Sequence, residues 1–489
     1  MAKRKRDVVD KDARATTKPF SSKKSKAANG KPKSRSSSPL DPETIQIVVG
    51  SYDQVLHGLT ATISDGKAEF ADTFLFNAHN SAIRCVAVSP PSVATPGQTQ
   101  KVFLASGSTD ERIHIYNLSA HPPSRKNQDL LAKVTPRPIL ENAKNREMGT
   151  LFHHASTITA LRFPSRSKLL TASEDSTIAV ARTRDWSVLS TIKAPVPKAH
   201  GRPSGDTAPL GATPSGVNDF AIHPSMKLMI SVSKGEKCMR LWNLVTGKKA
   251  GVLSFSKDML QEIGEGRHST GEGRKVVWGS VDGADEFAVG FDRDVVVFGM
   301  DSVPKCRVMT GQRTKVHQFI YVSADETSLL AVATEAGQIL FFSTKEEDLL
   351  PPGEVNGKKG TLPSAKLVGF VGGKAESMSG RIKDVVVLSS RVNKGILYLV
   401  GAGSEGKVRV WTLQANDLIA AAAKEKAGEE PIGKLVGTFE SQNRITCLAG
   451  YVMIPRPDGV EDSEDEGEED ADDDDDEGED ETDGSEDDE

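Results

Sequence analysis

The sequence lacks long apolar runs and has few cysteines. No stretch approaches the roughly 18 consecutive apolar residues that predict a membrane-spanning helix. The four cysteines, Cys85, Cys238, Cys306 and Cys447, are scattered without a C-x-x-C pair, which argues against a disulfide framework and a zinc module. The first residues, Met-Ala-Lys-Arg-Lys-Arg, precede no apolar run and predict no secretory signal. We therefore expect a reducing compartment, cytosolic or nuclear.

Charge divides the 489 residues into three unlike parts. Residues 1–40 hold thirteen Lys/Arg and three Asp/Glu, whereas residues 461–489 hold 22 Asp/Glu and no basic residue. Both ends have too little apolar surface to offset chain entropy, and like charges keep the acidic end extended. We therefore predict a disordered basic tail over 1–41, a folded domain over 42–456 and a disordered acidic tail over 457–489.

The middle of the chain repeats a short β-rich pattern, in which an apolar residue is followed three positions later by a bulky apolar one. Its seven copies begin at Ile83, Ile158, Val217, a position near Trp278, Val316, Ile382 and Ile445. Each of the first six copies precedes a second strand, a tight turn and a third strand. Four strands in a unit of about forty residues are typical of a β-propeller.

This spacing predicts an all-β fold, a β-propeller of seven blades. The segment 45–76 offers only later strands of a blade, and 444–453 offers only a first strand. We expect these two segments to form the closing blade together, which leaves no open edge in the ring.

An acidic residue recurs in the second turn of each unit, with an aromatic residue six positions later in most units, as in Asp110 and Tyr116. This pattern resembles the WD-repeat family. The resemblance implies a buried hydrogen-bond chain from a His, a Ser or Thr, the turn Asp and the aromatic residue. Two units supply its candidates: His79, Ser108, Asp110 and Tyr116 in one, and His154, Ser173 and Asp175 in the other.

Uneven spacing between the first strands indicates four insertions. Residues 119–146 and 344–364 interrupt third-to-fourth strand connections, whereas 194–216 and 254–273 precede first strands and are expected on the opposite face. Residues 416–428 predict a helix with Asn416 as N-cap and Gly428 as its end.

Sequence patterns for catalysis are weak. Gly401–Lys407 fits two phosphate-loop patterns, but Val408 stands where a Ser or Thr would bind magnesium and a strand follows, so a β-turn is the better interpretation. His153 and His154 have no carboxylate or Cys at ligand spacing. We predict no enzyme activity, no metal, no cofactor, no small-molecule substrate and no membrane association.

Basic residues precede the core of four consecutive first strands. They are Arg274, Lys315, Arg381 and Arg444. In a WD propeller this position opens on the rim of the channel, so we predict a basic arc that attracts phosphate or an acidic peptide. The alternative is that these side chains are solvated loop residues.

The N-terminal segment carries dense basic clusters. The residues predicted to act in nuclear import are Lys3, Arg4, Lys5, Arg6, Lys23 and Lys24. A contact with nucleic acid is the other interpretation. The acidic tail is interpreted as a shield for basic partners, as a segment that folds back on the basic N-terminal arm, or as a solubility device.

The segment Ile47–Leu59, read IVVGSYDQVLHGL, resembles the family of the fungal maintenance-of-killer protein Mak eleven and the p21-activated-kinase-interacting protein one. Further matches are Ser106–Tyr116, Leu151–Thr159 and Arg240–Val245. The resemblance implies a non-catalytic assembly factor for the large (60S) ribosomal subunit, in the nucleus and nucleolus. Its implied partners are proteins of the preribosomal particle, including a ribosomal-protein-like factor, and precursor rRNA. The alternative is a signalling scaffold that binds and negatively regulates a p21-activated kinase, and a histone-binding propeller is a third possibility.

Overall fold

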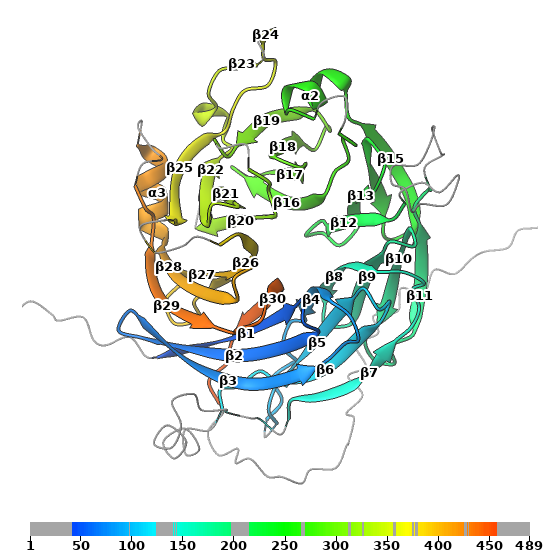
Figure 1. Cartoon of the computed structure of the whole chain (residues 1–489), viewed down its shortest axis with the longest axis vertical. Coiled ribbons are helices and arrows are strands. Elements are labelled where there is room, and N and C mark those ends of the chain that lie inside the picture. The colour runs from blue at the N-terminus through cyan, green and yellow to red at the C-terminus, as the bar shows by residue number, and fades with distance from the viewer. Residues whose placement is uncertain are drawn as a thin grey trace, which may run out of the picture. The chain divides into compact units, whose positions relative to one another are not determined.

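Four-stranded antiparallel sheets make up most of the chain in a computed structural model (Figure 1). The structure describes residues 42–456 except 97, 124–139, 141, 143, 197–214, 266–268, 312–313, 325–326, 356–357, 374–375, 377–379, 425–427 and 429. The two predicted tails lie outside the described residues.

Blades 1 to 3 follow one another along the chain without exchanging strands. Blade 1 contains β4 (Ile83–Val88), β5 (Lys101–Ser108), β6 (Ile113–Ser119) and β7 (Arg146–Leu151). Blade 2 contains β8 (Ile158–Ser165), β9 (Lys168–Ser173), β10 (Thr177–Arg182) and β11 (Val188–Lys193). Blade 3 contains β12 (Val217–Ile222), β13 (Leu228–Ser233), β14 (Cys238–Asn243) and β15 (Lys248–Ser254).

Blades 4 to 6 repeat this order, with one small hairpin inserted. Blade 4 contains β16 (Lys275–Val281), β17 (Ala284–Gly290), β18 (Asp294–Gly299) and β19 (Pro304–Met309). Blade 5 contains β20 (Gln318–Ala324), β21 (Thr327–Ala333), β22 (Gln338–Ser343) and β25 (Lys366–Gly372), and the hairpin is β23 (Glu354–Val355) and β24 (Lys358–Lys359). Blade 6 contains β26 (Ile382–Ser389), β27 (Ile396–Gly403), β28 (Lys407–Gln414) and β29 (Lys434–Glu440).

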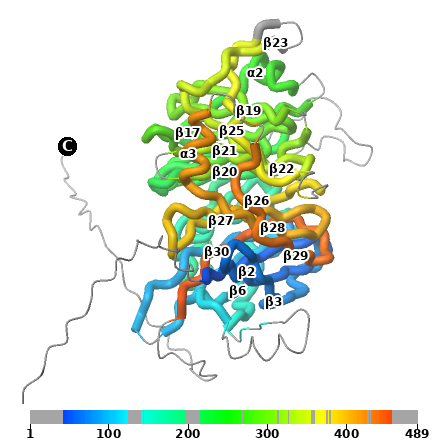
Figure 2. The backbone as a smooth tube through the Cα atoms, turned by 90° about the vertical axis from the view of Figure 1, so that its left-hand side faces the viewer, coloured from blue at the N-terminus to red at the C-terminus, as the bar shows by residue number. Residues whose placement is uncertain are grey.

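The closing blade joins both ends of the described chain. It contains β30 (Ile445–Val452), β1 (Glu43–Ser51), β2 (Val55–Ser64) and β3 (Lys67–Asn77), in that order. Ile45 pairs with Val452 and Val49 pairs with Leu448 in the antiparallel register of β1 and β30. The segments 45–76 and 444–453, expected to share one sheet, therefore both contribute strands to it. Figure 2 shows the blue strands β2 and β3 beside the orange strands β28 and β29 of blade 6.

The blades form a ring because each packs on the next. The first strands β30, β4, β8, β12, β16, β20 and β26 contact one another in sequence, and β26 returns to β30. Seven buried apolar clusters among the described residues each lie between two neighbouring blades. This arrangement confirms the seven-bladed propeller predicted from the repeats.

Burial explains the composition of the individual strands. Every residue of β27, sequence ILYLVGAG, is buried, because blades cover a middle strand on both faces. The outer strand β11, sequence VLSTIK, is mostly exposed, with Ile192 as its buried side chain. A continuous apolar run therefore marks the second or third strand of a blade, and a mixed run marks the fourth.

Two insertions predicted on opposite faces leave opposite ends of their strands, as the antiparallel order requires, but they extend to the edge of blade 4 and meet there, which was not predicted. The insertion before β16 contains α2 (Lys257–Glu262), and the carboxylate of Glu262 accepts hydrogen bonds from Thr361 N–H at 3.0 Å and Leu362 N–H at 2.9 Å. The insertion after β22 can reach α2 because it runs along the outer strand β19, where the N–H of Arg307 donates to the carbonyl of Pro363 at 2.9 Å.

The predicted helix is present but shorter and earlier. Helix α3 spans Ala415–Ala423, with Gln414 rather than Asn416 at the N-cap position, and it ends five residues before Gly428. Its start is set by packing, because Ala415 and Leu418 are buried against the core shared by blades 5 and 6. This tertiary contact overrides the capping preference of Asn416.

Candidate functional site

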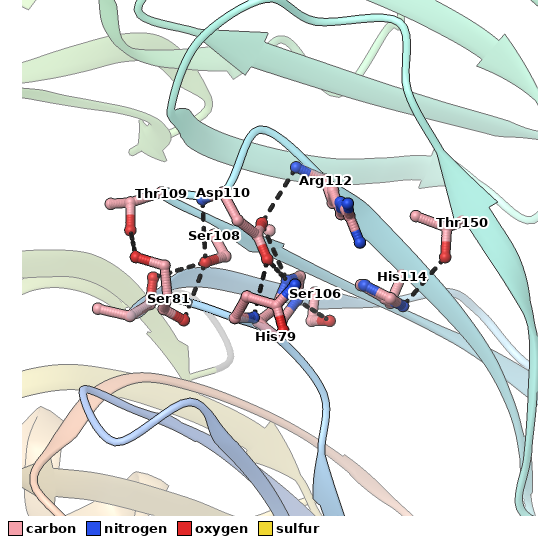
Figure 3. A network of polar contacts seen from close by, with 12 residues as sticks. His79, Ser81, Ser106, Ser108, Thr109, Asp110, Arg112, His114 and Thr150 are labelled. Carbon is pink, nitrogen blue, oxygen red and sulfur yellow. Dashed lines mark hydrogen bonds and ion pairs between the residues drawn. The ribbon is translucent and has the colours of Figure 1, made fainter.

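A polar network on blade 1 holds His79 beneath the turn between β5 and β6 (Figure 3). His79 Nδ1 lies 3.1 Å from Asp110 Oδ2, and His79 Nε2 lies 2.9 Å from Ser106 Oγ. Asp110 also accepts hydrogen bonds from the N–H groups of Asn80 and Arg112, each at 3.1 Å. Burial lowers the pKa of His79 although the Asp110 carboxylate opposes this shift, so the ring is neutral at pH 7.

The hydroxyl in this network was assigned to the wrong serine. Ser108 Oγ donates to the carbonyl of Ala82 at 2.9 Å, and Ser106, two residues earlier on the same strand, contacts His79. The reason is geometric: with Nδ1 on the turn aspartate, Nε2 on the far side of the ring points deeper along β5. Tyr116 stacks on Phe76 with ring centroids 5.5 Å apart, and its hydroxyl is buried without a hydrogen-bond partner among the described residues.

Blade 2 repeats the arrangement with a threonine. His154 Nδ1 lies 3.0 Å from Asp175 Oδ2, and His154 Nε2 lies 2.8 Å from Thr171 Oγ1. The predicted Ser173 instead donates to the carbonyl of Ser156 at 3.0 Å. In both blades the His and Asp were assigned to the right contact and the hydroxyl was not. These networks tie a loop to a turn, which is a structural role.

A cavity of about 1200 Å³ lies among the first strands of all seven blades. Its lining includes seven basic residues, Arg84, Arg162, Lys234, Arg274, Lys275, Lys383 and Arg444. The acidic residues of the lining are Glu174, Glu272 and Asp384. The turns after second strands and the segments before first strands border it, and we call this rim the channel mouth. Its excess of positive charge favours anionic ligands.

Of the predicted basic arc, Arg274 and Arg444 line the cavity, Lys315 and Arg381 are not in its lining, and three of the four residues are paired with acids. Arg274 and Lys315 both approach Asp292, at 3.2 and 3.3 Å. Arg381 lies 3.5 Å from Glu335. Arg444 forms no ion pair with a described residue. The turn acids of blades 4 and 5 thus offset part of the arc's charge, which reasoning from basic residues alone did not capture.

The central cation of this surface, Lys383, was missed from the sequence. Burial lowers its pKa first, followed by the positive charges of Arg381 and Arg444, while Glu335 opposes the shift. Lys383 directly follows Ile382, whose side chain is buried in the blade core. Because side chains alternate along a strand, a residue that directly follows a core residue faces away from that core. This alternation was the available signal.

Deeper in the channel, two aspartates brace neighbouring blades. Asp219 of β12 accepts a hydrogen bond from the N–H of Val276 in β16 at 3.3 Å, and Lys275 Nζ lies 3.8 Å from its carboxylate. Asp384 of β26 accepts a hydrogen bond from the N–H of Leu448 in β30 at 2.8 Å. Asp219 thereby offsets part of the charge of Lys275 and of Arg162, which lies 3.5 Å from it, and Glu174 pairs with Lys234 at 2.5 Å. Arg84, Lys383 and Arg444 are the lining cations that form no ion pair with a described residue.

Other candidates from the sequence take structural roles or cannot be placed. Gly403–Lys407 turns from β27 into β28, and Gly406 has a φ of 85°, a conformation that glycine adopts without strain. The nuclear import candidates Lys3–Arg6, Lys23 and Lys24 lie outside the described residues. Within the described part of the chain, no cluster of His, Cys, Asp or Glu is arranged to hold a metal ion. Over the same residues, no helix has the length and apolar character needed to cross a membrane.

Comparisons with known proteins agree with this geometry. The model of the WD domain, G-beta repeat, matches residues 71–117 and 145–180, which include the two complete histidine networks. The chain is 28% identical to Protein MAK11 of Saccharomyces cerevisiae over 78% of its length and 80% of that protein. It is 26% identical to a p21-activated protein kinase-interacting protein 1-like protein of Gallus gallus over 83% of its length and 80% of that protein. It is also 26% identical to Shk1 kinase-binding protein 15 of Schizosaccharomyces pombe over 43% of its length and 47% of that protein.

The repeats and the closed ring define a WD40-repeat β-propeller, a class of scaffolds that are typically non-catalytic. The matches support its membership of the family that contains MAK11 and the p21-activated protein kinase-interacting protein 1-like proteins.

Proposed function

We propose that this protein is a non-catalytic assembly factor for the large ribosomal subunit that binds protein and RNA on early nucleolar precursor particles. The observation that carries the proposal is the cationic channel mouth on a propeller of the MAK11 type. Precursor particles present dense phosphate charge, which a surface with Arg381, Lys383 and Arg444 attracts. The resemblance described for Ile47–Leu59 supports the same role.

Reversing the charge of two exposed mouth residues, Arg381→Glu with Arg444→Glu, should reduce co-sedimentation with precursor particles at least tenfold at physiological salt. Each reversal replaces attraction for phosphate by repulsion, and neither side chain supports a blade core. The measurement is the fraction of protein in the particle peak of a sucrose gradient. A control, Lys248→Glu with Lys249→Glu, makes the same charge change on the exposed residues of outer strand β15 and should sediment as the wild type does. Equal sedimentation of the mouth variant and the control would remove the mouth as the particle-binding surface.

The proposed function requires localisation to the nucleolus, and the candidate localisation signals lie in residues 1–41. Deleting residues 1–40 should move a fluorescent fusion out of the nucleolus, because the basic clusters at Lys3–Arg6 and Lys23–Lys24 are removed together. Restoring Lys3–Arg6 on an otherwise neutral segment of equal length should recover import. A deletion variant that stays nucleolar would assign the address to the propeller.

The second candidate function is a scaffold that binds a p21-activated kinase and restrains it. The observation that favours it is the names of the relatives, which include kinase-interacting and kinase-binding proteins. The two functions differ in their need for RNA. Affinity purification with and without nuclease separates them, since kinase recovery that survives nuclease treatment supports the scaffold and loss of all partners supports the particle.

A further inference from the structure

An exposed aromatic ring stands at the channel mouth. Tyr52 lies in the turn between β1 and β2 and is 59% exposed, although it lines the cavity. The guanidinium carbon of Arg444 lies 5.4 Å from the centre of its ring, a cation–π contact. The ring therefore offers a face to a ligand at the edge of the cavity.

The turn that carries Tyr52 is fixed to the first strand of its own blade. The N–H of Tyr52 donates to the carbonyl of Arg444 at 2.8 Å, and the N–H of Arg444 donates to Asp53 Oδ2 at 3.1 Å. Within the turn, the N–H of Val55 donates to Ser51 Oγ at 3.1 Å. The backbone under the ring is therefore ordered before any ligand arrives, so binding needs little further ordering of this segment.

Basic side chains lie next to the Tyr52 ring, on the side of blade 6. Arg444 touches the ring, and Lys383 is close enough to Arg444 and to Arg381 for their charges to interact. Four acids adjoin the group: Asp53 holds the Arg444 backbone, Glu335 pairs with Arg381, Glu405 pairs with Arg409, and Asp384 accepts from the Leu448 N–H. Glu335, Glu405 and Asp384 already hold other partners of the wall, whereas Lys383 and Arg444 form no ion pair with a described residue.

We propose that the channel mouth binds single-stranded RNA, with one base stacked on Tyr52 and the adjoining phosphates held by Arg444 and Lys383. Alternation of a stacking ring and cations is the arrangement that proteins use for single strands without sequence preference. The inference deepens the proposed function by naming the RNA-binding surface, and it rests on that function for its biological setting.

The same cations would attract an acidic peptide, but two observations favour RNA. A carboxylate gains little from an exposed phenol ring, whereas every base has a face that stacks. The chain also carries 22 acidic residues in 461–489, so a site selective for carboxylates alone would be exposed to its own polyanion at high effective concentration. Stacking on Tyr52 gives RNA an advantage that such a segment lacks.

The test is fluorescence anisotropy of a labelled 12-nucleotide oligouridylate titrated with the full chain. Tyr52→Ala should weaken binding about tenfold, because stacking of one base is lost, and Tyr52→Phe should bind within twofold of the wild type, because the ring remains. Arg444→Gln should weaken binding and reduce the dependence of affinity on salt. Residues 1–40 are identical in all variants, so differences report the mouth and not the basic tail. Lys248→Gln serves as the control for loss of one exposed positive charge elsewhere.

Wild-type affinity in Tyr52→Ala would overturn the inference. Displacement of the RNA by polyglutamate of equal charge as readily as by unlabelled RNA would overturn it too, and would assign the mouth to acidic peptides. The two proposals fail separately. Absence of RNA binding with particle association intact removes this inference and leaves an assembly factor that binds through protein, whereas RNA binding without particle association removes the proposed role on the particle.

Discussion

A chain that ends at Asn443 should lose cooperative folding. This truncation removes β30, whose Ile445 is fully buried, and it leaves the full length of β1 as an unpaired edge beside the channel. It also takes the Leu448 N–H from the buried carboxylate of Asp384, which burial already disfavours as a charge. We expect no cooperative thermal transition, together with aggregation on size-exclusion chromatography.

The matched control is a chain that ends at Arg456. It lacks the same acidic residues 461–489 but keeps β30 and the hydrogen bond from the N–H of Ile454 to the carbonyl of Ala120. It should melt within a few degrees of the full chain. If the chain ending at Asn443 unfolds in the same transition as this control, the closing strand does not stabilise the ring.

Replacing Glu286 by Ala should lower the free energy of unfolding by about 3 kcal/mol, because the change leaves a cation and two hydroxyls without their acceptor. The buried carboxylate lies 2.9 Å from Lys305 Nζ and accepts hydrogen bonds from Tyr321 OH at 2.8 Å and Thr344 Oγ1 at 2.6 Å. These partners come from blades 4 and 5, so the side chain joins two sheets. Urea unfolding followed by circular dichroism measures the loss.

Two variants separate the charge from the contacts. Glu286→Gln keeps an acceptor for the hydroxyls and should lose less than the alanine variant. Glu347→Ala removes an exposed carboxylate near the same blade and should change stability by no more than about 0.5 kcal/mol. An alanine variant at Glu286 as stable as Glu347→Ala would show that Lys305 and the two hydroxyls find other partners.

The propeller could be predicted because its signal repeats. One apolar pattern recurs seven times, and blades cover each middle strand on both faces, so strands such as β27 are apolar throughout. Features that depend on one contact could not be predicted in this way. Packing of Leu418 moved the start of α3, and Glu262 joined two insertions through residues about a hundred positions apart.

Basic residues near the channel could be proposed from the sequence, but the acids that pair with them could not. Of the arc residues, Arg274 and Arg444 line the cavity, and the turn acid Glu335, some 46 residues before Arg381, lies beside Arg381. Lys383 was not predicted because the arc was defined by the residue before the core position of each first strand, whereas Lys383 follows the core residue Ile382. Tyr52 was recognised as part of a turn, but its exposure beside Arg444 depends on how strands from opposite ends of the chain pair.

The pairing of Ile45 with Val452 also affects folding during synthesis, because the two residues lie near opposite ends of the chain. The partner of β1 is translated about 400 residues later, which at typical rates of synthesis is a delay of roughly 20–80 s. During that interval the nascent chain already contains the strands of the other six blades, while the edge of β1 that pairs with β30 is still unpaired. Such an edge invites pairing with other nascent chains. We therefore expect the newly made protein to depend on chaperones until its last strand emerges.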